Sequence, residues 1–81
     1  MPLLLGDSLV ARLDLKSDRK GDALLVVGAF AEAGQATGAV AEAALAELHS
    51  LREWLGLSSL LVAPRGDLAP RLTKLARPTS R

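Results

Sequence analysis

Two apolar runs and the charged segment between them decide the fold of this 81-residue chain. The first run reads Ser8-Leu-Val-Ala-Arg-Leu-Asp-Leu-Lys16, and the second reads Ala23-Leu-Leu-Val-Val-Gly-Ala-Phe-Ala31. Alternate residues of the first run are apolar, namely Leu9, Ala11, Leu13 and Leu15. The residues that alternate with them are Val10, Arg12, Asp14 and Lys16. This period of two predicts a strand with one buried and one solvated face.

The second run is apolar at every position, which predicts a central or covered strand. Gly28 within it is a candidate position for a β-bulge. The six residues between the runs combine charges with Gly21, which can take a left-handed conformation, and so they predict a hairpin loop. Residues 8–16 and 23–31 are therefore predicted to form an antiparallel hairpin.

One long helix is predicted over residues 39–55. Apolar residues recur there at helical spacing, namely Val40, Ala44, Leu48, Leu51 and Leu55. Thr37 is a suitable N-cap, and Gly56 stands where a left-handed residue commonly ends a helix. Trp54 lies at the edge of the apolar stripe, where one face of its ring is expected to pack.

Two shorter elements are predicted after the long helix. Residues 59–63 form a short strand before Pro64, and Asp67 is expected to cap a weak helix over residues 68–75 that Pro70 interrupts. The predicted fold class is α+β, with a small antiparallel sheet, made of the hairpin and strand 59–63, packed by the long helix. We expect one small domain over residues 1–76 and a frayed basic tail over residues 77–81.

The composition excludes several classes of protein. With no cysteine and one histidine, a disulfide framework, a cysteine nucleophile and a zinc cage of cysteine and histidine ligands are ruled out. The longest apolar run, residues 23–31, is about half as long as a membrane span, and residues 1–5 lack the basic region of a secretory signal. We therefore expect a cytoplasmic protein. Its richness in leucine and alanine is typical of a high-GC bacterial genome.

Several short motifs have both a chemical and a structural interpretation. Gly6-Asp7-Ser8-Leu9 matches the block of one class of ester hydrolases, but a nucleophilic serine needs a nearby base, and His49 lacks the aspartate that those enzymes carry three residues before it. A turn before the first strand is the favoured interpretation. Arg65-Gly66-Asp67 is likewise interpreted as a turn. His49 and Glu53 are interpreted as part of a solvated helix face, since two ligands do not form a metal site.

A set of basic residues is the strongest candidate for a binding site. Arg12 and Lys16 share the polar face of the first strand, and Arg19 and Lys20 lie in the adjoining loop. Four cations along one edge suit contacts with DNA phosphates, which position a protein on the duplex without reading its sequence. Asp14 and the aspartates of the loop oppose this interpretation, so an ordinary solvated hairpin remains the alternative.

Residues 4–20 carry a resemblance to a known family. They read Leu4-Leu-Gly-Asp-Ser-Leu-Val-Ala-Arg-Leu-Asp-Leu-Lys-Ser-Asp-Arg-Lys20, which resembles the C-terminal region of bacterial crosslink-repair DNA glycosylases that contain winged-helix DNA-binding domains. The similarity extends over nearly the whole chain and continues in four further segments, residues 24–27, 31–34, 51–57 and 65–68.

Members of that family are several times longer, and their tandem winged-helix units and β-rich C-terminal part form a concave DNA-binding surface. They excise damaged bases with a motif of glutamine, an aliphatic residue, and glutamine or aspartate. In this chain the only glutamine, Gln35, is followed by Ala36 and Thr37, so the motif is absent. Ser8 also replaces a residue that is usually basic in the family. The resemblance therefore implies the C-terminal module alone, with no catalytic residue, metal or cofactor.

The sequence thus leads to two hypotheses from different classes. The first is a non-catalytic DNA-binding or accessory module that contacts duplex DNA weakly through Arg12, Lys16, Arg19 and Lys20, or docks onto a winged-helix partner protein. The alternative is a small structural or homo-oligomerising domain with no role in nucleic-acid binding. In that case the strand over residues 23–31 buries its second face against another copy.

Overall fold

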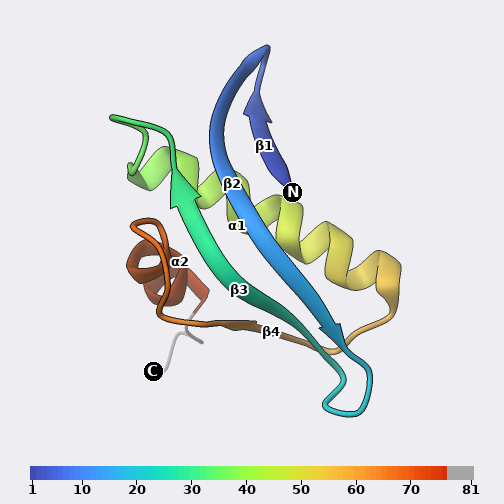
Figure 1. Ribbon diagram of the computed structural model, residues 1–81. Helices are drawn as coiled ribbons and strands as arrows, with labels where there is room; N and C mark the ends of the chain where they lie inside the picture. The colour runs from blue at the N-terminus through green and yellow to red at the C-terminus, as the bar shows by residue number, and fades with distance from the viewer. Residues whose placement is uncertain (77–81) are drawn as a thin grey trace, which may run out of the picture.

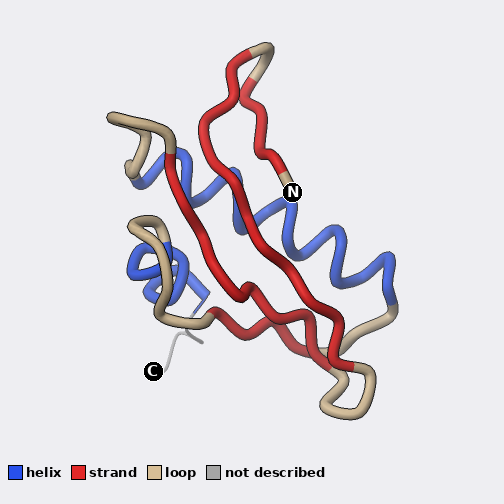
Figure 2. Tube along the Cα trace, in the orientation of Figure 1, coloured by secondary structure: helices blue, strands red, loops and turns tan. Residues whose placement is uncertain are grey.

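The computed structural model describes residues 1–76, which form a single layer of strands backed by two helices (Figures 1 and 2). In chain order the elements are β1 (Pro2–Leu5), β2 (Ser8–Asp18), β3 (Ala23–Ala31), α1 (Gly38–Leu55), β4 (Ser59–Val62) and α2 (Ala69–Ala76). The α+β class is confirmed, and each predicted element is present with its ends shifted by no more than two residues. The expected tail, residues 77–81, lies outside the described residues.

The sheet has the strand order β1-β2-β3-β4 and is mixed. β1 and β2 are antiparallel, as are β2 and β3, whereas β4 runs parallel to β3. The prediction of a wholly antiparallel sheet was therefore wrong for β4. The physical reason is the crossover between the two strands, because α1 carries the chain back along the sheet and lets β4 start beside the same end at which β3 starts.

The strand β1 was not predicted. Residues 2–5 pair with β2 from Pro2 opposite Arg12 to Leu5 opposite Ser8, and Gly6, with φ of 62°, makes the turn between them. The turn at Gly6 and Asp7 was predicted, but the strand before it was not. A four-residue run that begins with proline has too little alternation to be recognised without its pairing partner.

Both helices pack on the same face of the sheet. Figure 1 shows α1 crossing behind the strands, with α2 beside it near β3 and β4, and the two helices contact each other. The side chains between the helices and the sheet form the core: Leu3, Val10, Ala11, Leu13, Leu24, Val26, Ala29, Val40, Ala41, Ala44, Leu48, Leu57, Leu68, Ala69 and Leu72. Within residues 1–76, no element covers the other face of the sheet.

Two β-bulges decide which side chains reach each face. In β2 the register places Leu3 opposite Ala11 and Leu4 opposite Leu9, so Val10 is the extra residue. Val10 is therefore buried, at 4% exposure, while Leu9 is 46% exposed, the reverse of what strict alternation predicts. In β3 the extra residue is Val27, next to Gly28, where a bulge was expected.

The ends of α1 confirm the predicted caps. The Thr37 hydroxyl accepts a hydrogen bond from the Val40 amide at 3.2 Å, and Gly56 takes the left-handed conformation with φ of 73°. Trp54 does not pack as expected, because its side chain is 82% exposed. At about 100° per residue it lies roughly 120° around the helix from the buried Leu48, which turns it away from the sheet.

The loop between β4 and α2 extends the pairing of β3. The Ala29 amide donates to the Arg65 carbonyl at 2.9 Å, and the Asp67 carboxylate accepts from the Ala31 amide at 2.8 Å. Asp67 was expected to cap the last helix, but its side chain instead tethers the end of β3. Pro70 is the second residue of α2, where a missing amide is tolerated, so it does not interrupt the helix as predicted.

None of the helices among residues 1–76 is both long enough and apolar enough to cross a membrane.

Candidate nucleic-acid interface

Arg12 and Lys16 lie on the uncovered face of the sheet. We call this surface the open face and define it by Arg12, Asp14, Lys16, Leu25, Phe30 and Leu61. The register places Arg12 opposite Phe30 and Lys16 opposite Leu25, and both basic side chains are exposed. Because β2 is regular between them, the two residues are about 13 Å apart along the strand at about 3.3 Å per residue. The prediction that they share a solvated face is confirmed.

The side chain of Phe30 supports Arg12. The guanidinium carbon of Arg12 lies 5.7 Å from the centre of the Phe30 ring, a distance at which a cation is attracted to the ring face. The ring lies over Gly28, since a β-carbon added there would come within 2.7 Å of the ring. Glycine at this position therefore leaves room for the ring, and the ring in turn holds the guanidinium on the open face.

Lys16 borders a shallow hollow on the same face. The hollow has a volume of about 460 Å³ and is lined by Lys16 and by residues of β3, β4 and the segment after β4. The lining residues other than Lys16 are all apolar: Leu25, Val26, Val27, Leu61, Val62 and Ala63. Among residues 1–76, Lys16 is thus the one charged residue that lines this apolar depression.

The charge of the open face is small. Asp14 lies between Arg12 and Lys16 on β2 and faces Gly28 on β3, and its side chain is exposed. These three charges sum to one positive charge, so the potential over this face is weak. Contacts with an anion would then come from the individual cations rather than from a broad basic surface.

Of the other two predicted cations, Arg19 does not lie on the open face. The guanidinium of Arg19 donates to the carbonyl of Leu55 at the end of α1, at 3.1 Å, which directs it toward the helix layer. This is a favourable place for a cation, because the last carbonyls of a helix carry partial negative charge. Lys20 is exposed in the loop between β2 and β3. The structure therefore brings together Arg12 and Lys16 and separates Arg19 from them.

The loop that carries Arg19 and Lys20 is held against the end of α1. The Asp22 carbonyl accepts from the amides of Ser58 and Ser59, and the Asp22 carboxylate accepts from the Ser58 amide. Asp22 takes the left-handed conformation in this loop, with φ of 56°, whereas Gly21 was expected to do so. Gly21 instead donates its amide hydrogen to the Asp18 carboxylate at 3.1 Å.

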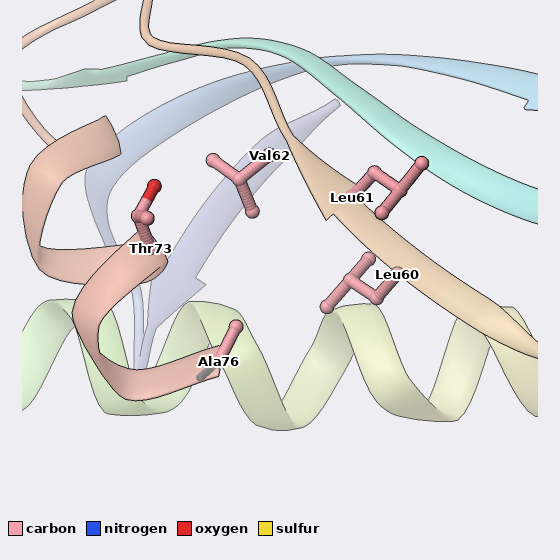
Figure 3. Close-up of a pocket in the computed structure, with 5 residues that line it drawn as sticks. All are labelled: Leu60, Leu61, Val62, Thr73 and Ala76. Atoms are coloured by element: carbon pink, nitrogen blue, oxygen red, sulfur yellow. The ribbon is translucent and has the colours of Figure 1, made fainter. Parts of the chain in front are cut away.

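Residues with possible catalytic or metal-binding roles are not gathered in one place. Ser8 pairs with Leu5 at the tip of the β1–β2 hairpin, and Nδ1 of the exposed His49 accepts from Arg52 at 3.4 Å. No group of three metal-ligating side chains occurs among residues 1–76. A second hollow, of about 160 Å³, lies between β4 and α2, and Thr73 is the one polar side chain that residues 1–76 contribute to its lining (Figure 3).

Phe30 was not predicted to be a part of the candidate interface. Strict alternation places Phe30 on the same face as Leu24 and Val26, which point into the core. The bulge at Val27 moves every later residue of β3 to the opposite face, which brings the ring beside Arg12. Gly28 was the available signal, because a glycine within an apolar strand often marks a bulge.

Comparisons of the chain with known protein families, with curated proteins and with solved structures found no match. The resemblance to the C-terminal region of the DNA glycosylases therefore stays a prediction.

Proposed function

We propose that this chain is a non-catalytic accessory module that contacts the phosphates of duplex DNA through Arg12 and Lys16. The observation that carries the proposal is that both cations are exposed on the one face of the sheet that neither helix covers. The resemblance of residues 4–20 to the C-terminal region of the DNA glycosylases supports the same partner. The proposal includes a cytoplasmic setting, where a chain without cysteine needs no disulfide.

The two cations have different roles in this proposal. Arg12 is oriented by the Phe30 ring, and a guanidinium can donate two hydrogen bonds to one phosphate while one side of its plane remains stacked. Lys16 acts as a flexible point charge about 13 Å along the strand. Neither residue reads base edges, so binding is independent of sequence and weak, with dissociation constants of about 10⁻⁴ to 10⁻⁶ M near physiological salt.

The salt dependence of binding tests this proposal. Affinity for a short labelled duplex is measured by fluorescence anisotropy between about 50 mM and about 200 mM salt. Two phosphate contacts predict that log K falls with log salt at a slope near −2, shallower than the slope near −3 expected for three or four contacts. Lys16→Ala and Arg12→Ala should each make the slope shallower by about one.

Two further variants serve as controls. Lys74→Ala removes an exposed cation from α2, on the other side of the sheet, and should leave the slope unchanged. Arg19→Ala should also leave it unchanged, because its guanidinium is engaged with α1. The proposal is refuted if binding does not depend on salt, or if Lys74→Ala changes the slope as much as Lys16→Ala does.

A specific observation also favours the alternative, a homo-oligomerising domain. Large apolar side chains are exposed along both outer strands of the sheet, where Leu4 and Leu61 are each 55% exposed. Burial of such side chains against a second copy would remove apolar area from water. Sedimentation velocity over rising concentration tests this function, and a chain that stays monomeric at several hundred micromolar rules it out.

A further inference from the structure

The outer edge of β4 carries backbone groups that face away from the sheet. β4 is the last strand in the sheet order, and the amides of Ser59 and Ala63 donate to carbonyls of the segment 22–26. Because successive residues of a strand direct their backbone groups to opposite sides, the N–H and C=O groups of Leu60 and Val62 point outward. Within residues 1–76 no further strand pairs with them.

The residues of β4 itself lack the features that usually protect an exposed strand. Natural sheet edges carry proline, charged residues or covering elements. The opposite edge strand, β1, begins with Pro2, and Glu47 lines a hollow beside it. β4 reads Ser-Leu-Leu-Val, with neither proline nor charge, and a hollow lies between it and Thr73 and Ala76 of α2 (Figure 3).

We propose that β4 pairs with β4 of a second copy, antiparallel and about a two-fold axis that passes beside Leu61. In this register Leu60 faces Val62 of the other copy, and Val62 faces its Leu60. Both residues of each pair direct N–H and C=O toward each other, so each pair exchanges both hydrogen bonds. The interface is isologous, because the same segment contributes from both copies.

The small number of outward backbone groups on β4 favours pairing with a second copy over pairing with a longer foreign strand. Pro64 occupies the next outward position and has no amide hydrogen, while the Ser58 amide is already bonded to Asp22. A longer strand would therefore place unpaired groups opposite Pro64. In a second copy Pro64 and Ser58 restrict pairing in the same way, so the paired segments of the two copies have the same length. Since β4 has no charged residue, no like charges meet within the pair.

The pairing would also bury Leu61 and join the two open faces. The two Leu61 residues face each other as the central non-hydrogen-bonded pair, where the Cα atoms are about 4.5 Å apart and the side chains are close. Leu61 is 55% exposed in the single chain, so pairing would remove part of its surface from water. Arg12 and Lys16 of both copies would then lie on one continuous eight-stranded surface, although the pairing does not depend on any nucleic-acid role.

The oligomeric state of the purified chain, without DNA, tests the pairing. Because the contact is shorter than a standard interface, we expect a monomer–dimer equilibrium with a midpoint on the order of 100 µM in sedimentation equilibrium. Leu61→Lys places two ammonium groups at the axis and should shift the midpoint at least tenfold higher. Leu4→Lys is the matched control, since Leu4 is equally exposed on the other edge strand, and it should leave the midpoint unchanged.

Two site-specific measurements separate edge pairing from stacking of the open faces. The chain has no cysteine, so Leu61→Cys can form a disulfide only between copies, and the spacing of a non-hydrogen-bonded pair fits disulfide geometry. It should cross-link much faster under mild oxidation than Leu4→Cys. In the wild type, hydrogen exchange of the Leu60 and Val62 amides should slow as concentration rises. A monomer at every concentration, a dimer that Leu61→Lys leaves intact, or exchange at Leu60 and Val62 that does not slow would each overturn the proposal.

Discussion

Gly66 is the position at which a single added methyl group should destabilise the protein most. Its φ is 98°, a conformation that residues with a β-carbon rarely take. A β-carbon placed there would overlap the carbonyl oxygen of Ala29 and lie 2.6 Å from its carbonyl carbon, so it would meet the backbone of the central strand β3. A backbone atom within a sheet cannot move aside as the end of a flexible side chain can.

The expected loss of stability for Gly66→Ala follows from two effects. The left-handed conformation costs alanine about 1–3 kcal/mol. To relieve the overlap, the loop must also move away from β3, which breaks the bonds from the Ala29 amide to Arg65 and from the Leu68 amide to Ala29, each worth about 1 kcal/mol. The sum is about 3–5 kcal/mol, comparable with the whole stability expected of a chain of this size. We expect Gly66→Ala to be largely unfolded at 25 °C.

Urea denaturation followed by helical circular dichroism measures this loss. Trp54 is 82% exposed, so its fluorescence would report poorly on unfolding. Gly34→Ala is the matched control, because Gly34 also has a positive φ, 77°, but nothing lies within 4 Å of an added β-carbon. It should lose only about 1–2 kcal/mol. If Gly66→Ala is no less stable than Gly34→Ala, the proposed overlap with β3 is wrong.

Two further predictions concern the helix α1 and are measured by the same denaturation. Thr37→Ala removes the hydroxyl that accepts from the Val40 amide and should lower the free energy of unfolding by about 1 kcal/mol, whereas Thr37→Ser should retain most of it. Leu48→Ala leaves a cavity beneath the sheet and should cost about 2–5 kcal/mol, because Leu48 is fully buried. Leu4→Ala, at an exposed position, should cost much less, and similar losses for the two leucine variants would contradict the assigned core.

Much of the fold could be predicted because local patterns dictate it. Alternation over residues 8–16 and the continuous apolar run over residues 23–31 located β2 and β3, and Thr37 and Gly56 marked the caps of α1. The direction of β4 could not be predicted from the residues near it in the sequence. It depends on the path of α1 across the sheet, so the short strand predicted over residues 59–63 is present as β4 but runs parallel to β3 and not antiparallel to its neighbour.

The candidate site was predicted only in part for a related reason. Arg12 and Lys16 lie on one face because β2 is regular between them, and the period of two was enough to find that. Arg19 does not lie with Arg12 and Lys16, because its guanidinium donates a hydrogen bond to the carbonyl of Leu55, thirty-six positions along the chain. Contacts between residues so far apart in the sequence leave no trace in a local pattern.

The amino-acid sequence by itself determined the type of every element except β1, the caps of α1 and the pair of cations on β2, because each depends on residues within a few positions of one another. The tertiary structure alone decided which face the side chains beyond each bulge reach. A bulge shifts the pairing by one residue, and with a period of two that shift exchanges the faces of every residue beyond it. Because of these shifts Val10 lies in the core, Leu9 lies outside it, and the Phe30 ring lies beside Arg12.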